Sequence, residues 1–149
     1  MGASLTSPGA TRPLRSLFTP EDANRALPLV RSIVRDLVED FRRLRHAGRE
    51  RRALEAETAG SGPAGRRLVS LAEIVSETSE RVEGYLKELA GLGVEVRDLE
   101  LGMVDFPTLM GSEPAFLCWR LEEAEVAFWH AADRAHSERQ PIVVASTPA

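Results

Sequence analysis

The chain has 149 residues, 43% of them hydrophobic and 28% charged, which is typical of an ordinary soluble globular domain. No apolar run approaches the roughly 20 residues that a membrane helix needs, and a single cysteine excludes an intramolecular disulfide, so we expect a cytoplasmic protein. The net charge of −4 is concentrated in residues 94–138, whose ten acids and three bases argue against nucleic-acid binding and are compatible with cation binding.

The first predicted element is a long helix that follows a flexible tail at residues 1–17. Thr19 can cap this helix, and Pro20 at the first helical position loses no needed N–H group. Apolar residues then recur with alternating spacings of four and three, as in a coiled coil. They are Ala23, Leu27, Val30, Val34, Leu37, Phe41 and Leu44. This apolar seam fades after Leu44, and the sequence up to Ala59 is polar but compatible with a helix.

A second long helix is predicted after the break at Gly60-Ser61-Gly62-Pro63. It runs from about Ala64 to Ala90, and Gly91-Leu92-Gly93 ends it. Its apolar positions also alternate between spacings of three and four. Two long amphipathic helices joined by a short turn must run antiparallel, so residues 18–92 are expected to form a coiled-coil-like hairpin.

From Gly93 onward the sequence has the period of β-strands. Val94–Arg97 alternates apolar and polar residues, and Met103–Phe106 is a second short strand that we expect to end at Pro107. Ala115–Leu121 and Glu125–His130 are predicted to form a β-hairpin. If Leu121 lies opposite Val126, then Leu117 faces His130 and Cys118 lies opposite Trp129. The end of the chain, residues 143–149, is expected to be loose.

These elements predict an α+β fold in which a long antiparallel helical hairpin packs on a small, mostly antiparallel β-sheet. We expect one domain over residues 18–142, with the helical hairpin in residues 18–92 and the β-rich part in residues 93–142.

A metal site is the most specific chemical hypothesis. Asp105, Glu125 and His130 have side chains that a hard or borderline divalent metal ion binds. Their spacing matches no dedicated metal motif, and strict strand alternation sends Glu125 and His130 to opposite faces of the sheet. The alternative is that His130 is a partly buried structural histidine and that the acids lie at the surface or in turns.

A ligand pocket is a second hypothesis. Trp119, Arg120, Trp129 and Cys118 are candidate lining residues, whereas the alternative is that the aromatic residues simply form the core. Arg120 could also pair with Glu125 across the hairpin without any chemical role. Cys118 and His130 are predicted on opposite faces, which argues against a cysteine–histidine catalytic pair.

Several stretches resemble a known family. They are G-M-V-D-F-P at Gly102–Pro107, L-C-W-R-L-x-E-x-E-V-A-F-W-H at Leu117–His130, R-Q-P-I, and F-T-P-E-D-A-N-R-A-L-P at Phe18–Pro28. They resemble the bacterial domain-of-unknown-function 2203 family over residues 18–142. The resemblance implies no activity, because the family is uncharacterised. The chain departs from the family pattern at Glu122 and around His136, and the second departure puts a role for His136 in doubt.

Two functions follow as hypotheses. The first is binding of a divalent metal ion or a small ligand where the helices meet the sheet, with or without catalysis. The second is a non-catalytic interaction module whose helical hairpin binds another protein or forms a homo-oligomer, because its apolar stripe is wider than two helices need. Arginines 42–52 could hold a phosphate or RNA, but interleaved acids and the lack of aromatic residues argue against nucleic acid.

Overall fold

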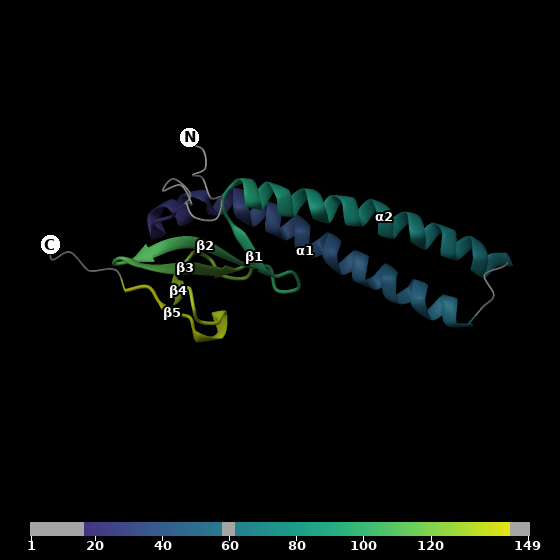
Figure 1. Ribbon diagram of the computed structural model, residues 1–149. Helices are drawn as coiled ribbons and strands as arrows, with labels where there is room; N and C mark the ends of the chain where they lie inside the picture. Colours follow the sequence, from purple (N-terminus) through teal and green to yellow (C-terminus); the bar gives the residue numbers. More distant parts are fainter. Residues whose placement is uncertain (1–16, 58–61, 144–149) are drawn as a thin grey trace, which may run out of the picture.

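The computed structural model describes residues 17–57 and 62–143 (Figure 1). Its elements are helices α1 (Pro20–Glu57) and α2 (Gly62–Gly91), strands β1 (Glu95–Asp98), β2 (Met103–Met110), β3 (Glu113–Arg120), β4 (Phe128–Ala131) and β5 (Gln140–Pro141), and the short 3-10 helix η3 (His136–Glu138). The predicted α+β fold, a long helical hairpin on a small antiparallel sheet, is confirmed. Of the two predicted tails, only Leu17 and Val143 lie within the described residues.

Helix α1 begins at a reciprocal cap. The N–H of Asp22 donates to Oγ1 of Thr19 at 3.0 Å, and the N–H of Thr19 donates to Oδ2 of Asp22 at 3.1 Å. These bonds satisfy two backbone donors that a helix start leaves without partners. The hydrogen bonds from Thr19 also lower the pKa of Asp22. The predicted helix start is therefore correct, and it fixes how α1 enters the core.

The two helices form an antiparallel pair. Arg67 near the start of α2 makes two hydrogen bonds to Glu50 near the end of α1, at 2.8 and 2.9 Å. Further along α2, Nε of Arg81 donates to the buried Asp40 at 3.1 Å. None of the described helices is long and apolar enough to cross a membrane.

The five strands form one antiparallel sheet in the order β1-β2-β3-β4-β5, which packs on the first half of α1 (Figure 1). Gly102, in the turn between β1 and β2, has a φ of 69°. A Cβ atom there would lie 3.0 Å from side chains of Val34 and Val38, so glycine lets the sheet approach α1 closely.

Beyond the sheet the hairpin continues alone. Arg45 of α1 pairs with Glu100 in the turn between β1 and β2, at the end of the sheet. Past this contact the two helices extend away from the sheet (Figure 1). We call residues 46–57 and 62–78 the distal arm.

The predicted pairing of the last β-hairpin was wrong by one residue. Phe116 lies opposite His130, and Cys118 lies opposite Phe128. Because side chains alternate along a strand, a shift of one residue exchanges the two faces of a strand. His130 and Cys118 therefore lie on the same face of the sheet, contrary to the prediction, and Trp129 shares the other face with Leu117.

The predicted end of the second strand at Pro107 was also wrong, because β2 continues to Met110 and pairs Pro107 with Phe116. The carbonyl of Pro107 accepts a hydrogen bond of 2.8 Å from the N–H of Phe18. The backbone N and O atoms of one strand residue point to the same side of the strand. The nitrogen of Pro107 therefore faces the side of β1, and β1 does not extend as far as Pro107, so no strand there needs an N–H donor. Proline is tolerated there as on an edge strand.

The core lies between α1, α2 and one face of the sheet. Its largest fully buried side chains include Trp119, Phe106 and Leu117. The loop between β3 and β4 is held on α1 by long-range bonds. Asn24 accepts from the N–H of Val126 at 2.8 Å, and Arg31 donates to the carbonyl of Ala124 at 2.8 Å.

Candidate functional site

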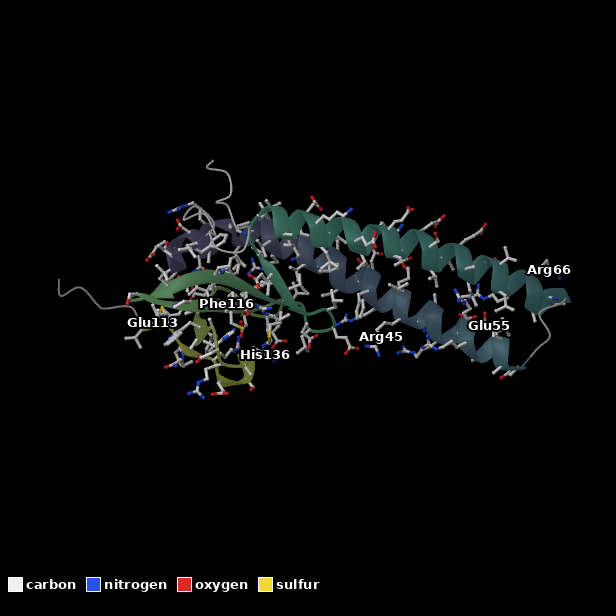
Figure 2. All side chains as sticks on the ribbon, viewed as in Figure 1. Arg45, Glu55, Arg66, Glu113, Phe116 and His136 are labelled. Atoms are coloured by element: carbon white, nitrogen blue, oxygen red, sulfur yellow. The ribbon has the colours of Figure 1, made fainter. Side chains whose placement is uncertain are left out.

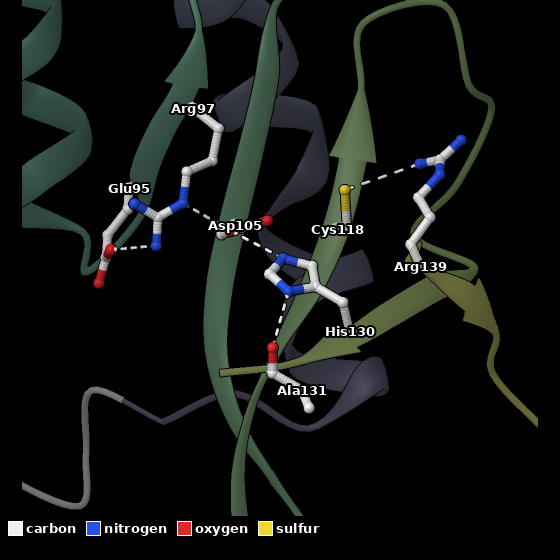
Figure 3. A network of polar contacts seen from close by, with 7 residues as sticks. All are labelled: Glu95, Arg97, Asp105, Cys118, His130, Ala131 and Arg139. Atoms are coloured by element: carbon white, nitrogen blue, oxygen red, sulfur yellow. Dashed lines mark hydrogen bonds and ion pairs between the residues drawn. The ribbon is translucent and has the colours of Figure 1, made fainter. Parts of the chain in front are cut away.

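A buried polar network lies on the face of the sheet that points away from the helices (Figure 3). Asp105 of β2 is fully buried, and its Oδ2 accepts a hydrogen bond of 2.7 Å from Nε of Arg97 in β1. The same oxygen lies 3.0 Å from Nε2 of His130 in β4, whose Nδ1 lies 3.0 Å from the carbonyl oxygen of Ala131. Arg97 also donates to Glu95 at 2.7 Å. Three strands thus contribute polar side chains to one cluster.

The contacts of His130 determine what this network can do. A carbonyl oxygen only accepts, so Nδ1 of His130 must carry the hydrogen that points to Ala131. Nε2 of His130 is therefore the ring nitrogen that faces the carboxylate, 3.0 Å from Oδ2 of Asp105. The other carboxylate oxygen, Oδ1 of Asp105, is buried and has no hydrogen-bond partner among the described residues. The network thus joins β1, β2 and β4 through contacts of Arg97 and His130 with one carboxylate.

The predicted metal ligands come together only in part. Asp105 and His130 are in direct contact, so two of the three candidate ligands lie side by side. Glu125 is exposed and lies in the loop before β4, beside the first turns of α1. Within the described parts of the chain, no group of three or more His, Cys, Asp or Glu side chains is placed to hold a metal ion. The third member of the cluster is instead the guanidinium of Arg97.

The predicted ligand-pocket residues lie in different surroundings. Trp119 is fully buried, and its Nε1 donates to the carbonyl of Glu123 at 2.9 Å. Cys118 is also fully buried. Trp129 lines a cavity of about 460 Å³ on the opposite face of the sheet from Cys118. Arg120 forms its ion pair with Glu123, at 3.8 Å, and not with Glu125 as the sequence hypothesis had it.

A second polar contact was not predicted from the sequence. Arg139, just before β5, pairs with Glu123 and lies over the ring of Phe128 at 4.1 Å from its centroid. Its Nη1 also donates to Sγ of Cys118 at 3.7 Å (Figure 3). Glu123 and Arg139 are 16 residues apart, and no local pattern pairs them. The contact holds the segment before β5 against the sheet and covers the cysteine.

Cys118 is expected to be unreactive in the folded protein. Burial raises the pKa of its thiol to about 11, and the nearby Asp105 carboxylate contributes to the increase. Because only the thiolate reacts, the thiolate fraction near pH 8 should be about 100-fold lower than in an unfolded chain. A thiol-reactive dye should therefore label the native protein far more slowly than the protein in denaturant, and faster as the pH rises. Equal rates in the two states would contradict the buried placement.

The distal arm carries a groove between its two helices, with a volume of about 400 Å³. Its floor is formed by Ala47, Leu71 and Ile74. Its rim carries charges of both signs and includes Arg43, Arg67, Arg81, Glu50 and Glu77. We call this the mixed-charge groove. Charged side chains line both helices of the arm, as Figure 2 shows around Glu55 and Arg66.

Comparison with known proteins identifies one family. The family described as "Uncharacterized conserved protein (DUF2203)" matches residues 16–142, which is most of the chain. Comparison with curated proteins and with solved structures gives no match.

Proposed function

Because the chain belongs to the family of uncharacterized conserved proteins DUF2203, whose description assigns no activity, we propose a function from the geometry alone. We propose that it is a non-catalytic interaction module that self-associates through the distal arm. A second copy of the chain is the proposed partner. The sheet and the first half of the hairpin then serve as the base that holds the arm.

The observation that carries this proposal is how far the helices extend beyond their last buried residues. Ala47 is the last buried residue of α1, and Leu71 is the first buried residue of α2. Residues 48–57 and 62–70 are helical, yet none of them is buried. Helices in water gain most of their stability from packing, so a long unburied helical pair is marginal without a partner. A second arm would supply that packing.

The mixed-charge groove fits a second copy. In a symmetric dimer the same surface meets itself, so each charge must find its opposite on an identical patch. The rim of this groove carries both arginine and glutamate, and its floor is apolar. Two arms packed along these grooves would form a four-helix arrangement, in which the half-buried Ile74 is covered beside Ala47 and Leu71, which are already buried in one chain.

Binding of a divalent metal ion or small ligand is the other function predicted from the sequence, and it stays a prediction. The contact of Asp105 with His130 and the unpartnered Oδ1 of Asp105 favour it. The positive guanidinium of Arg97 against the same carboxylate opposes a second cation there. Glu125 contributes no ligand to the cluster. The arm is therefore the better-supported site.

A pair of variants tests the proposal. Ile74→Glu places a charge on the half-buried floor of the mixed-charge groove, whereas Val69→Glu places the same charge on α2 at a valine that is 62% exposed and lies outside the groove. We expect Ile74→Glu to weaken self-association by at least about tenfold, because burying an unpaired charge is costly. Val69→Glu should leave it unchanged. Sedimentation equilibrium measures the constant, and circular dichroism checks that both variants are folded. Equal effects of the two substitutions would contradict the proposal.

A further inference from the structure

A second groove on the arm carries charge of one sign only. Six arginines and one acid lie between residues 42 and 52. The acid, Glu50, turns toward Arg67 and lines the mixed-charge groove. The other groove has a volume of about 450 Å³ and no acidic lining residue. It is lined by Leu44, Arg45, Gly48, Arg49, Arg51, Arg52 and Val75, and we call it the basic groove. Folding has thus separated charges that are interleaved in the sequence.

The basic groove begins where the sheet ends. Val34 and Val38 of α1 lie under the turn at Gly102, and Arg45 pairs with Glu100 of the same turn. Arg45, labelled in Figure 2, is also one of the lining residues of the basic groove. A partner in this groove would therefore lie next to the sheet, along the part of α1 that the sheet leaves uncovered.

Much of the charge in the groove is not neutralised within the chain. Arg45 pairs with Glu100, and Arg51 pairs with Glu55 at 3.6 Å. Neither Arg49 nor Arg52 forms a salt bridge with the described residues. Two arginines are thus available to an external anion.

Gly48 lies in this groove although the fold does not require a glycine there. A Cβ atom at this position would meet only Nη1 of Arg52, at 3.7 Å, which is an ordinary contact. Glycine inside a helix destabilises it relative to alanine. Such a residue suits a place where another backbone approaches closely.

We propose that the basic groove binds an acidic amphipathic helix of a partner protein. The arginines match acidic side chains, while Leu44 and Val75 offer apolar surface that such a helix can cover. No aromatic side chain lines the groove for base stacking, and a phosphate backbone has no apolar face, so nucleic acid fits less well. From Leu44 to Arg52 the groove follows α1 for about 12 Å, enough for about two turns of the bound helix. This surface is separate from the mixed-charge groove and does not depend on self-association.

The test uses the full chain and a labelled synthetic helical peptide of about 18 residues, with leucines on one face and glutamates beside them. A control peptide has the same composition with the leucines spread around the helix. Fluorescence anisotropy should show saturable binding of the first peptide and binding at least about tenfold weaker for the control. Arg49→Glu and Arg52→Glu should each weaken binding of the first peptide by about tenfold or more. Arg66→Glu, which makes the same charge change on α2 outside the groove, should leave it unchanged.

A further variant separates binding from folding. Gly48→Ala should weaken peptide binding, because a methyl group narrows the groove, while the melting temperature stays the same or rises. Equal binding of the two peptides, or equal effects of Arg49→Glu and Arg66→Glu, would overturn the proposal in favour of general charge attraction. Tighter binding of a single-stranded oligothymidine of similar length would overturn it in favour of nucleic acid. None of these results depends on the oligomeric mass, so the two proposals can fail separately.

Discussion

Asp105→Asn is expected to lower the free energy of unfolding by about 3–5 kcal/mol, because it removes the carboxylate from a buried ion-pair network. Asp105 is fully buried, and its Oδ2 contacts both Arg97 and His130. Asparagine has nearly the same shape, so the loss reports on charge and hydrogen bonding and not on a cavity. The substitution removes the carboxylate that Arg97 and His130 both contact, although Arg97 keeps its pair with Glu95. The remaining amide also has a buried N–H group or oxygen without a partner.

The control for this prediction is Glu125→Gln. Glu125 was placed with Asp105 in the predicted metal site, but it is exposed, so its substitution should change stability by no more than about 0.5 kcal/mol. Urea denaturation followed by circular dichroism measures both variants. Similar small effects of the two substitutions would mean that the network contributes little to the fold.

Trp119→Ala is expected to cost about 3–5 kcal/mol of unfolding free energy, as truncation of a buried aromatic residue usually does. Trp119 is fully buried on the helix-facing side of β3. Its Nε1 donates to the carbonyl of Glu123, and Arg31 lies over its ring at 5.5 Å from the centroid. The substitution would therefore open a cavity and release the loop between β3 and β4.

Trp129→Ala is the matched control, because it truncates the only other tryptophan, which is partly buried and lines a cavity at the edge of the core. Its effect should be clearly smaller than that of Trp119→Ala. Trp119→Phe should fall between them, at about 1–2 kcal/mol, because the indole N–H bond is lost while most of the burial remains. Denaturation curves with equal midpoints for Trp119→Ala and Trp129→Ala would contradict the assignment of Trp119 to the core.

The helical hairpin could be predicted from the sequence because its signals are local. The cap at Thr19, the alternating apolar spacing and the Gly-rich break each involve residues close together in the chain. The apolar seam fades after Leu44, and Ala47 is the last buried residue of α1. The apolar spacing, the helix cap and the Gly-rich break were thus enough to predict the two long helices.

The pairing of the last β-hairpin could not be predicted in the same way. The sequence suggested a tight turn at residues 122–124, but the connection between β3 and β4 is longer. It is shaped by Asn24 and Arg31, which lie 102 and 93 residues away from their partners in the loop. With this longer connection the observed register differs by one residue from the predicted one. His130 thereby came to lie on the face of Asp105 and Cys118, where alternation alone had not placed it.

The cationic members of the polar network were also missed. Arg97 contacts Asp105 only because β1 and β2 pair with Glu95 opposite Asp105, and that register includes an irregularity after Val96. Arg139 reaches Cys118 because β5 pairs with β4. Both contacts depend on how strands pair. The sequence thus indicated Asp105 and His130 by their chemistry. The strand pairing placed Arg97 against the same carboxylate, where its positive charge opposes the predicted metal ion.

If the distal arm binds a second copy of the chain, the mass of the 149-residue protein in solution must depend on its concentration. Light scattering over a dilution series in the micromolar range should give twice the 16.3 kDa of one chain at the upper concentrations and a fall toward one chain on dilution. A mass of one chain at every concentration, with the helices intact by circular dichroism, would contradict it.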